Sequence, residues 1–160
     1  MTRKRDAATR TLMNDNLLFR VRHFVYEQAV EHGSIPAREA IGAALNIGES
    51  ETDGALAQLS ELHHLALLPS GEIMMAQPFS AIPTAYVVTA DQHTWWAPCL
   101  WDALGIAAMV GDDVRIRTSC ADCNEGVILS VKGGAPAFPA EAIMHFVVPA
   151  RDWWQDIVFT

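Results

Sequence analysis

The sequence predicts an α+β fold in which a winged-helix-like helical domain at residues 1–80 precedes a mostly antiparallel β domain at residues 81–160. Two observations lead to this prediction. Apolar residues recur every three or four positions through much of the first 65 residues, as on the inner face of helices. Beyond residue 84, short segments are strand-like, and some alternate apolar and polar residues, around one apolar helix.

Three helices and a hairpin are expected in the first domain. Gly33 ends the first helix because glycine readily adopts the left-handed conformation at a helix C-terminus, and Pro36 suits the first turn of the second. Ser50 to Asp53 resembles a capping box, which predicts the start of a third helix with leucines 56, 59, 62 and 65 on its inner face. The expected ranges are 11–32, 34–45 and 51–65 for the helices and 67–75 for the hairpin.

The second domain is expected to consist of strands around one apolar helix at residues 96–109. Val114–Thr118 alternates apolar and polar residues, and Gly133 and Gly134 form the turn after its hairpin partner. Trp153 and Trp154 are expected to close the core. The expected strands span residues 85–89, 114–118, 127–131, 143–148 and 157–159.

Composition and charge exclude several classes of protein. With 51% hydrophobic residues, the chain is not disordered. Its net charge is -8, and no Lys or Arg occurs from Glu39 to Val114, so the third helix has no cation to meet DNA phosphates. No apolar run is long enough to cross a membrane or to form a signal peptide. Three cysteines, an odd number, fit reduced thiols in a cytoplasmic protein.

Cys99 and Asp102 form the candidate catalytic pair. With Pro98 in the first helical turn, Cys99 lies at a helix N-terminus, where free N–H groups and the helix dipole favour a thiolate. Asp102 lies three residues further on the same face, and nearby tryptophans would raise the pKa of its carboxyl. The pair offers a soft nucleophile beside a proton donor. The alternative is a buried structural cysteine and an ordinary first-turn aspartate.

Residues 84–160 resemble the organomercurial (alkylmercury) lyase family. The resemblance is carried by the Cys-x-x-Asp element within Trp96–Leu104, by Val114–Cys120 and by Trp153–Thr160. It implies protonolysis of a carbon–mercury bond: soft cysteine sulfur binds mercury, and an aspartate delivers the proton to the departing carbon.

The resemblance assigns roles to individual residues. Cys99 matches the first catalytic cysteine, Asp102 matches the aspartate, and Cys120 matches a cysteine that is structural in the family. No resident cofactor is implied, since Hg(II) is substrate or product and free thiols are needed for turnover. The expected ligand is a small organomercurial or a soft metal ion.

The family's second catalytic cysteine follows the region matched by residues 156–160, so none of these 160 residues matches it. Either the sequence stops just short of that cysteine or the protein has diverged and lacks it. Alkylmercury lyase activity is expected if that cysteine lies beyond Thr160. The alternative is a non-catalytic module that binds or senses a soft metal such as Hg, Cu or Zn.

Cys120 and Cys123 form a Cys-x-x-Cys element for which several interpretations stay open. The two sulfurs could be half of a zinc site, which would need two further ligands such as His93 and His145. They could instead be a redox pair, or a secondary soft-metal site that passes mercury to Cys99. The simplest interpretation is two reduced cysteines without a special role.

Overall fold

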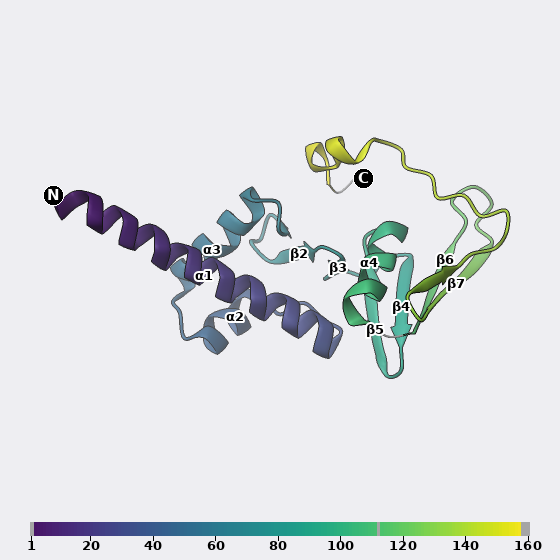
Figure 1. The fold of residues 1–160 in the computed structure, drawn as a ribbon, viewed down its shortest axis with the longest axis horizontal. Coiled ribbons are helices and arrows are strands. Elements are labelled where there is room, and N and C mark those ends of the chain that lie inside the picture. Colours follow the sequence, from purple (N-terminus) through teal and green to yellow (C-terminus); the bar gives the residue numbers. More distant parts are fainter. Residues whose placement is uncertain (1, 112, 158–160) are drawn as a thin grey trace. The chain divides into compact units, whose positions relative to one another are not determined.

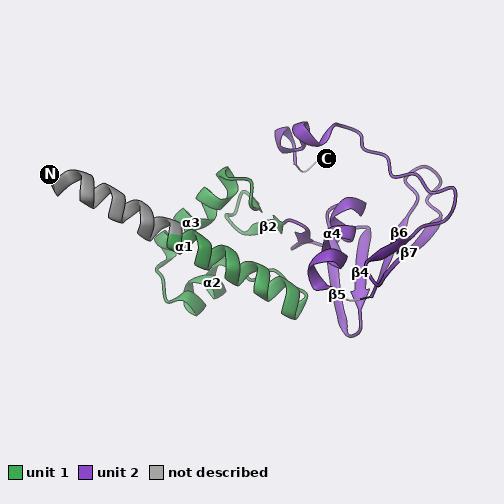
Figure 2. Ribbon diagram, in the orientation of Figure 1, with its two compact units in different colours: residues 1–76 green, residues 77–160 purple. Residues whose placement is uncertain are grey.

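The computed structural model describes residues 2–111 and 113–157, with side chains from residue 16 onward (Figure 1). The chain has the predicted α+β class. It divides into two compact units, Met1–Ala76 and Gln77–Thr160 (Figure 2), whereas the expected division was at residue 80. Among the residues described, no helix is both long and apolar enough to cross a membrane.

The first unit contains three helices followed by an antiparallel hairpin, in the predicted order. Its buried core is formed by side chains from all three helices and from the hairpin. Whether this arrangement is a winged helix stays a prediction. The elements are α1 (Thr2–His32), α2 (Arg38–Leu45), α3 (Glu49–Glu61), β1 (Ala66–Leu67) and β2 (Ile73–Ala76).

The helix boundaries differ from the predicted ones for local reasons. Helix α2 begins after Ala37, so Pro36 precedes the helix and does not form its first turn. The capping box of α3 uses Glu51, whose carboxylate accepts a hydrogen bond from the Gly48 N–H at 3.1 Å, so α3 begins earlier than predicted. Because α3 ends at Glu61, Leu62 leaves the inner face and is 54% exposed.

Arg38 forms ion pairs with four acidic residues of the first unit. Its guanidinium lies 3.1 Å from Asp53 and 3.3 Å from Glu39, and 3.8 and 3.9 Å from Glu49 and Glu72. These acids come from α2, α3 and the β1–β2 turn. A single cation at the start of the acidic segment therefore links three elements of the unit.

The second unit is an antiparallel sheet with one apolar helix, α4, packed against β4 and β5 (Figure 1). Within this unit the strands follow the order β3-β5-β4-β6-β7-β8. The elements are β3 (Phe79–Ser80), β4 (Tyr86–Ala90), β5 (His93–Ala97), α4 (Leu100–Val110), β6 (Val114–Ser119), β7 (Gly126–Lys132), β8 (Ala135–Ala137) and the 3-10 helix η1 (Ala150–Gln155).

Two predictions for this unit are wrong, and a third is tested at one residue alone. Residues 96 and 97 belong to β5, because residues 91–92 turn the chain and His93–Ala97 pairs with β4. Residues 143–148 form no strand; Phe146 packs instead on Trp101 and Trp153, at ring-centroid distances of 6.4 and 5.6 Å. Of the last predicted strand, Ile157 lies in a turn, and residues 158–159 lie outside the described residues.

The alternation of β6 and β7 generates a prediction about the stability of the second unit. Ile116 on β6 is 0% exposed, whereas Ile128 on β7 is 61% exposed. We expect Ile116→Ala to lower the free energy of unfolding by about 2–5 kcal/mol, because it leaves a cavity in the core. Ile128→Ala should cost less than about 1 kcal/mol.

Tryptophan fluorescence during urea unfolding measures this difference, because all five tryptophans lie in the second unit. Equal losses for the two variants would show that the sheet does not bury the face that contains Ile116.

Candidate active site

Cys99 and Asp102 lie in contact where β5 passes into α4. Cys99 is the N-cap residue of α4, and its carbonyl accepts the hydrogen bond from the Ala103 N–H at 3.0 Å. The Cys99 S–H donates to the Asp102 carboxylate, with 3.1 Å between Sγ and Oδ2. The sequence predicted that Pro98 lies in the first helical turn. It instead precedes the N-cap residue. The structure thus brings the two predicted residues together on one face.

Burial controls the protonation of this pair. It raises the pKa of the Cys99 thiol to about 11, and the negative charge of Asp102 acts in the same direction. Backbone N–H groups of Asp102 and Trp101 act in the opposite direction but do not outweigh burial. At neutral pH the sulfur is therefore a thiol, whereas its helix position predicted a thiolate.

Asp102 is affected by the same burial. Burial raises the pKa of its carboxyl, as the sequence predicted, and the hydrogen bond from Cys99 lowers it. The pair thus shares one proton between a soft sulfur and a carboxylate. A ligand that takes the sulfur must displace that proton, and Asp102 is the nearest base.

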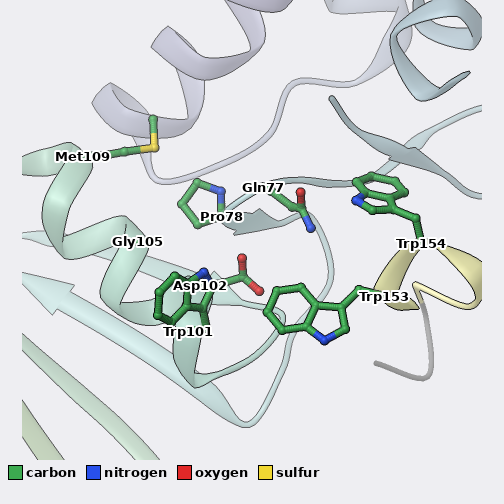
Figure 3. A pocket seen from close by; sticks show the side chains of 8 residues that line it. All are labelled: Gln77, Pro78, Trp101, Asp102, Gly105, Met109, Trp153 and Trp154. Carbon is green, nitrogen blue, oxygen red and sulfur yellow. The ribbon is translucent and has the colours of Figure 1, made fainter. Parts of the chain in front are cut away.

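Asp102 opens into a cavity of about 310 Å³ within the second unit. Figure 3 shows its carboxyl directed into the space between Trp101 and Trp153. Cys99 does not line the cavity, but its sulfur contacts Asp102, which is a lining residue. The cavity is lined by Gln77, Pro78, Trp101, Asp102, Gly105, Met109, Trp153 and Trp154.

The tryptophans around the cavity differ from those that were expected. Trp95 is buried in the core, and Trp96 is 38% exposed and does not line the cavity. Trp153 and Trp154, expected to close the core, are half-buried and line the cavity with Trp101. The Trp153 indole N–H donates to the Val148 carbonyl at 3.1 Å, which orients its ring. The aromatic wall of the cavity therefore consists of Trp101 from the start of α4 and of Trp153 and Trp154 from η1.

Several residues around the site were missed by sequence reasoning. A Cβ at Gly105 would lie 3.1 Å from the Cβ of Pro78, so glycine lets α4 approach Pro78 closely. A lone glycine in an otherwise apolar helix was the available signal. Tyr86 pairs with Ala97 in the sheet. Burial raises the pKa of its hydroxyl, and the charge that Cys99 carries once it ionises acts in the same direction. No sequence signal indicated this proximity.

Cys120 and Cys123 lie elsewhere, in the turn between β6 and β7, and neither lines the cavity. Both are free thiols. Backbone N–H groups of Cys123 and Asp122 lower the pKa of Cys120. In the described part of the chain, no three His, Cys, Asp or Glu side chains are grouped to hold a metal ion. His93 and His145 therefore do not complete a zinc site there.

The effect of Asp102 on the thiol can be measured by alkylation. Asp102→Asn removes a negative charge beside the sulfur, so we expect the pKa of Cys99 to fall below about 11 while burial keeps it above its ordinary value. The pH profile of iodoacetamide reaction gives this pKa when Cys120 and Cys123 are replaced by serine. Asp91→Asn, in an exposed turn, is the matched control and should change nothing. An unchanged profile in Asp102→Asn would contradict the contact.

Two comparisons with known proteins found matches. The family model for alkylmercury lyase (MerB) matches residues 79–160. The solved structure of the mercury-bound form of MerB2 matches with a TM-score of 0.59 at 18% sequence identity, covering 78% of this chain and 63% of that chain. This likeness shows a shared fold, and the chain spans less than two thirds of that protein. No curated protein sequence matches. Because the family model matches more than half of its residues, the chain belongs to the alkylmercury lyase family.

Proposed function

We propose that this protein cleaves the carbon–mercury bond of small organomercurials by protonolysis, with Cys99 and Asp102 as the catalytic residues. The observation that carries the proposal is the 3.1 Å contact between the Cys99 sulfur and an Asp102 carboxyl that lines the cavity. Membership of the alkylmercury lyase family supports it.

In the first step, the Cys99 sulfur forms a bond to mercury and the ligand that mercury carried leaves. The thiol proton passes to Asp102, whose oxygen already accepts its hydrogen bond. Soft sulfur is the donor that mercury prefers, which compensates for the high pKa of the thiol. This step leaves an organomercury group on sulfur beside a protonated carboxyl.

In the second step, Asp102 delivers its proton to the carbon bound to mercury. The carbon–mercury bond breaks, its electron pair forms the new carbon–hydrogen bond, and the hydrocarbon leaves. Burial favours the protonated carboxyl until the transfer occurs, because it raises the pKa of Asp102. Asp102 returns to a carboxylate, and mercury stays on Cys99 as a cation that requires a second ligand.

Free thiols supply that second ligand in the proposal, and no resident cofactor is used. Free thiolates bind Hg(II) on Cys99 and carry it away, so turnover depends on thiol concentration. The free cysteines of the chain suit the reducing conditions of the cytoplasm, where we place the activity. A protein that only binds or senses a soft metal would bind mercury at Cys99 without releasing hydrocarbon.

Release of benzene from phenylmercuric acetate tests the proposal. With excess monothiol, we expect the wild-type chain to release benzene and Cys99→Ser to fall to the rate of the thiol buffer alone. Asp102→Asn should be slower by at least about 100-fold, because it removes the proton donor. Headspace gas chromatography under single-turnover conditions measures the benzene.

Asp91→Asn is again the matched control and should keep the wild-type rate. Mercury bound by the wild type without benzene release would favour the binding module over the lyase. A wild-type rate in Asp102→Asn would exclude Asp102 as the proton donor.

The aromatic wall predicts a preference among organic groups. A cavity of about 150 Å³ accommodates benzene in another protein, so the 310 Å³ cavity is large enough for a phenyl group. We expect Trp101→Ala to lower kcat/KM for phenylmercury by about 2- to 10-fold more than for methylmercury, because an aromatic contact is lost. Trp96→Ala, outside the cavity, should leave this ratio unchanged. Equal losses for both substrates would contradict the assignment.

A further inference from the structure

The turn between β6 and β7 holds two of the three cysteines in a hydrogen-bonded loop. The Cys120 N–H donates to the Glu125 carbonyl at 2.8 Å, and the Asn124 N–H donates to the Cys120 carbonyl at 2.9 Å. Asn124 has φ +59°, a left-handed conformation that asparagine tolerates. The turn is therefore closed by two backbone hydrogen bonds, and β6 and β7 pair up to its base at Ser119 and Gly126.

The same turn places the two sulfurs next to each other. The hydrogen bond from the Asn124 N–H to the Cys120 carbonyl closes a single helical turn, in which side chains three positions apart, such as those of Cys120 and Cys123, lie on the same side. Both thiols are free, Cys120 is partly exposed and Cys123 is exposed. The backbone of Cys123 and of Asp122 lowers the pKa of the Cys120 thiol, which favours the thiolate that a metal ion requires.

We propose that Cys120 and Cys123 form a two-sulfur binding site for a thiophilic metal ion that accepts linear coordination, Hg(II) in particular. Zinc needs four ligands, and no group of three His, Cys, Asp or Glu side chains occurs among the residues the structure describes. Hg(II) is satisfied by two thiolates in line. The number of sulfurs and their softness together select such an ion.

This site is separate from Cys99 but lies at the same end of the sheet. Tyr86 on β4 pairs with Ala97 on β5, and Val87 on β4 pairs with Arg117 on β6. Strands β5 and β6 therefore end at the same edge of the sheet, where Cys99 follows β5 and Cys120 follows β6. Two strand spacings separate these strand ends, roughly 10 Å. One linear ion joins sulfurs only about 5 Å apart, if metal–sulfur bonds are about 2.3 Å. The turn therefore binds its own ion.

The two sulfurs of the turn also receive the Hg(II) product from Cys99, and this transfer alone rests on the proposed lyase function. A small thiol first displaces mercury from Cys99, and its proton passes to the Cys99 sulfur, so that mercury leaves with two small thiolates. The Cys120 and Cys123 sulfurs then each form a bond to mercury, and its two bonds to the small thiolates break. The Cys120 and Cys123 protons pass to the two small thiolates, which leave as thiols. Two protein sulfurs thereby replace one.

The binding test uses the full chain with Cys99→Ser, in which Cys120 and Cys123 are the only thiols. Reduced protein is titrated with HgCl₂ alone under argon, against an excess of a competing monothiol. We expect one Hg(II) per chain by native mass spectrometry, near-ultraviolet sulfur-to-mercury absorption, and loss of both thiols to Ellman's reagent. This chain has no proposed nucleophile, so the result is independent of lyase activity.

The control variants add Cys120→Ser or Cys123→Ser to Cys99→Ser. Each should bind Hg(II) at least about 100-fold more weakly under the same competition, because the second sulfur no longer binds intramolecularly. Tryptophan fluorescence verifies that the second unit is folded, and Cys123→Ala repeats the test with a smaller side chain.

Three outcomes would overturn the proposal. One is equal affinity in the chain that retains a single cysteine. Another is two mercury ions per chain, one on each sulfur. The third is a reduced pair that returns to a disulfide and binds no ion, which would identify the turn as a redox pair.

Discussion

The hydrogen bond from the Cys99 thiol to Asp102 is the interaction on which the chemistry of this protein depends. Two acidic groups 3.1 Å apart in a half-buried position do not both ionise readily, because each charge would be poorly solvated and would repel the other. The pair therefore keeps one proton between a sulfur and an oxygen. A ligand that replaces this proton on sulfur leaves it on the neighbouring carboxyl.

The surrounding fold maintains this pair through short connections. Strand β5 ends two residues before Cys99, and α4 begins one residue after it. The Thr84 hydroxyl donates to the Ala97 carbonyl at 2.6 Å, which ties the end of β5 to the start of β4. Ala103 and Ile106, fully buried on α4, hold the helix in the core. The sulfur is thus placed between a paired strand and a packed helix, with little conformational freedom.

The C-terminal segment completes the cavity through aromatic contacts. Phe146 lies between Trp101 of α4 and Trp153 of η1, so a segment without strand pairing is connected to the site by ring packing. The cavity wall is assembled from residues as distant in the chain as Gln77 and Trp154. The β6–β7 turn has a different chemistry, since Cys123 is exposed, Cys120 is partly exposed, and the backbone of Cys123 and of Asp122 lowers the pKa of Cys120.

Local patterns in the sequence determined the α+β class, the order of three helices and a hairpin, the β4, β6 and β7 strands, and the spacing that puts Asp102 beside Cys99. These features depend on neighbours a few positions apart. Only the tertiary structure decided that Trp153 and Trp154 line the cavity, that residues 143–148 form no strand, and that Cys99 is a thiol. Burial, strand pairing and ring contacts depend on segments that are distant in the sequence. They therefore cannot be predicted from the few residues on either side of each position.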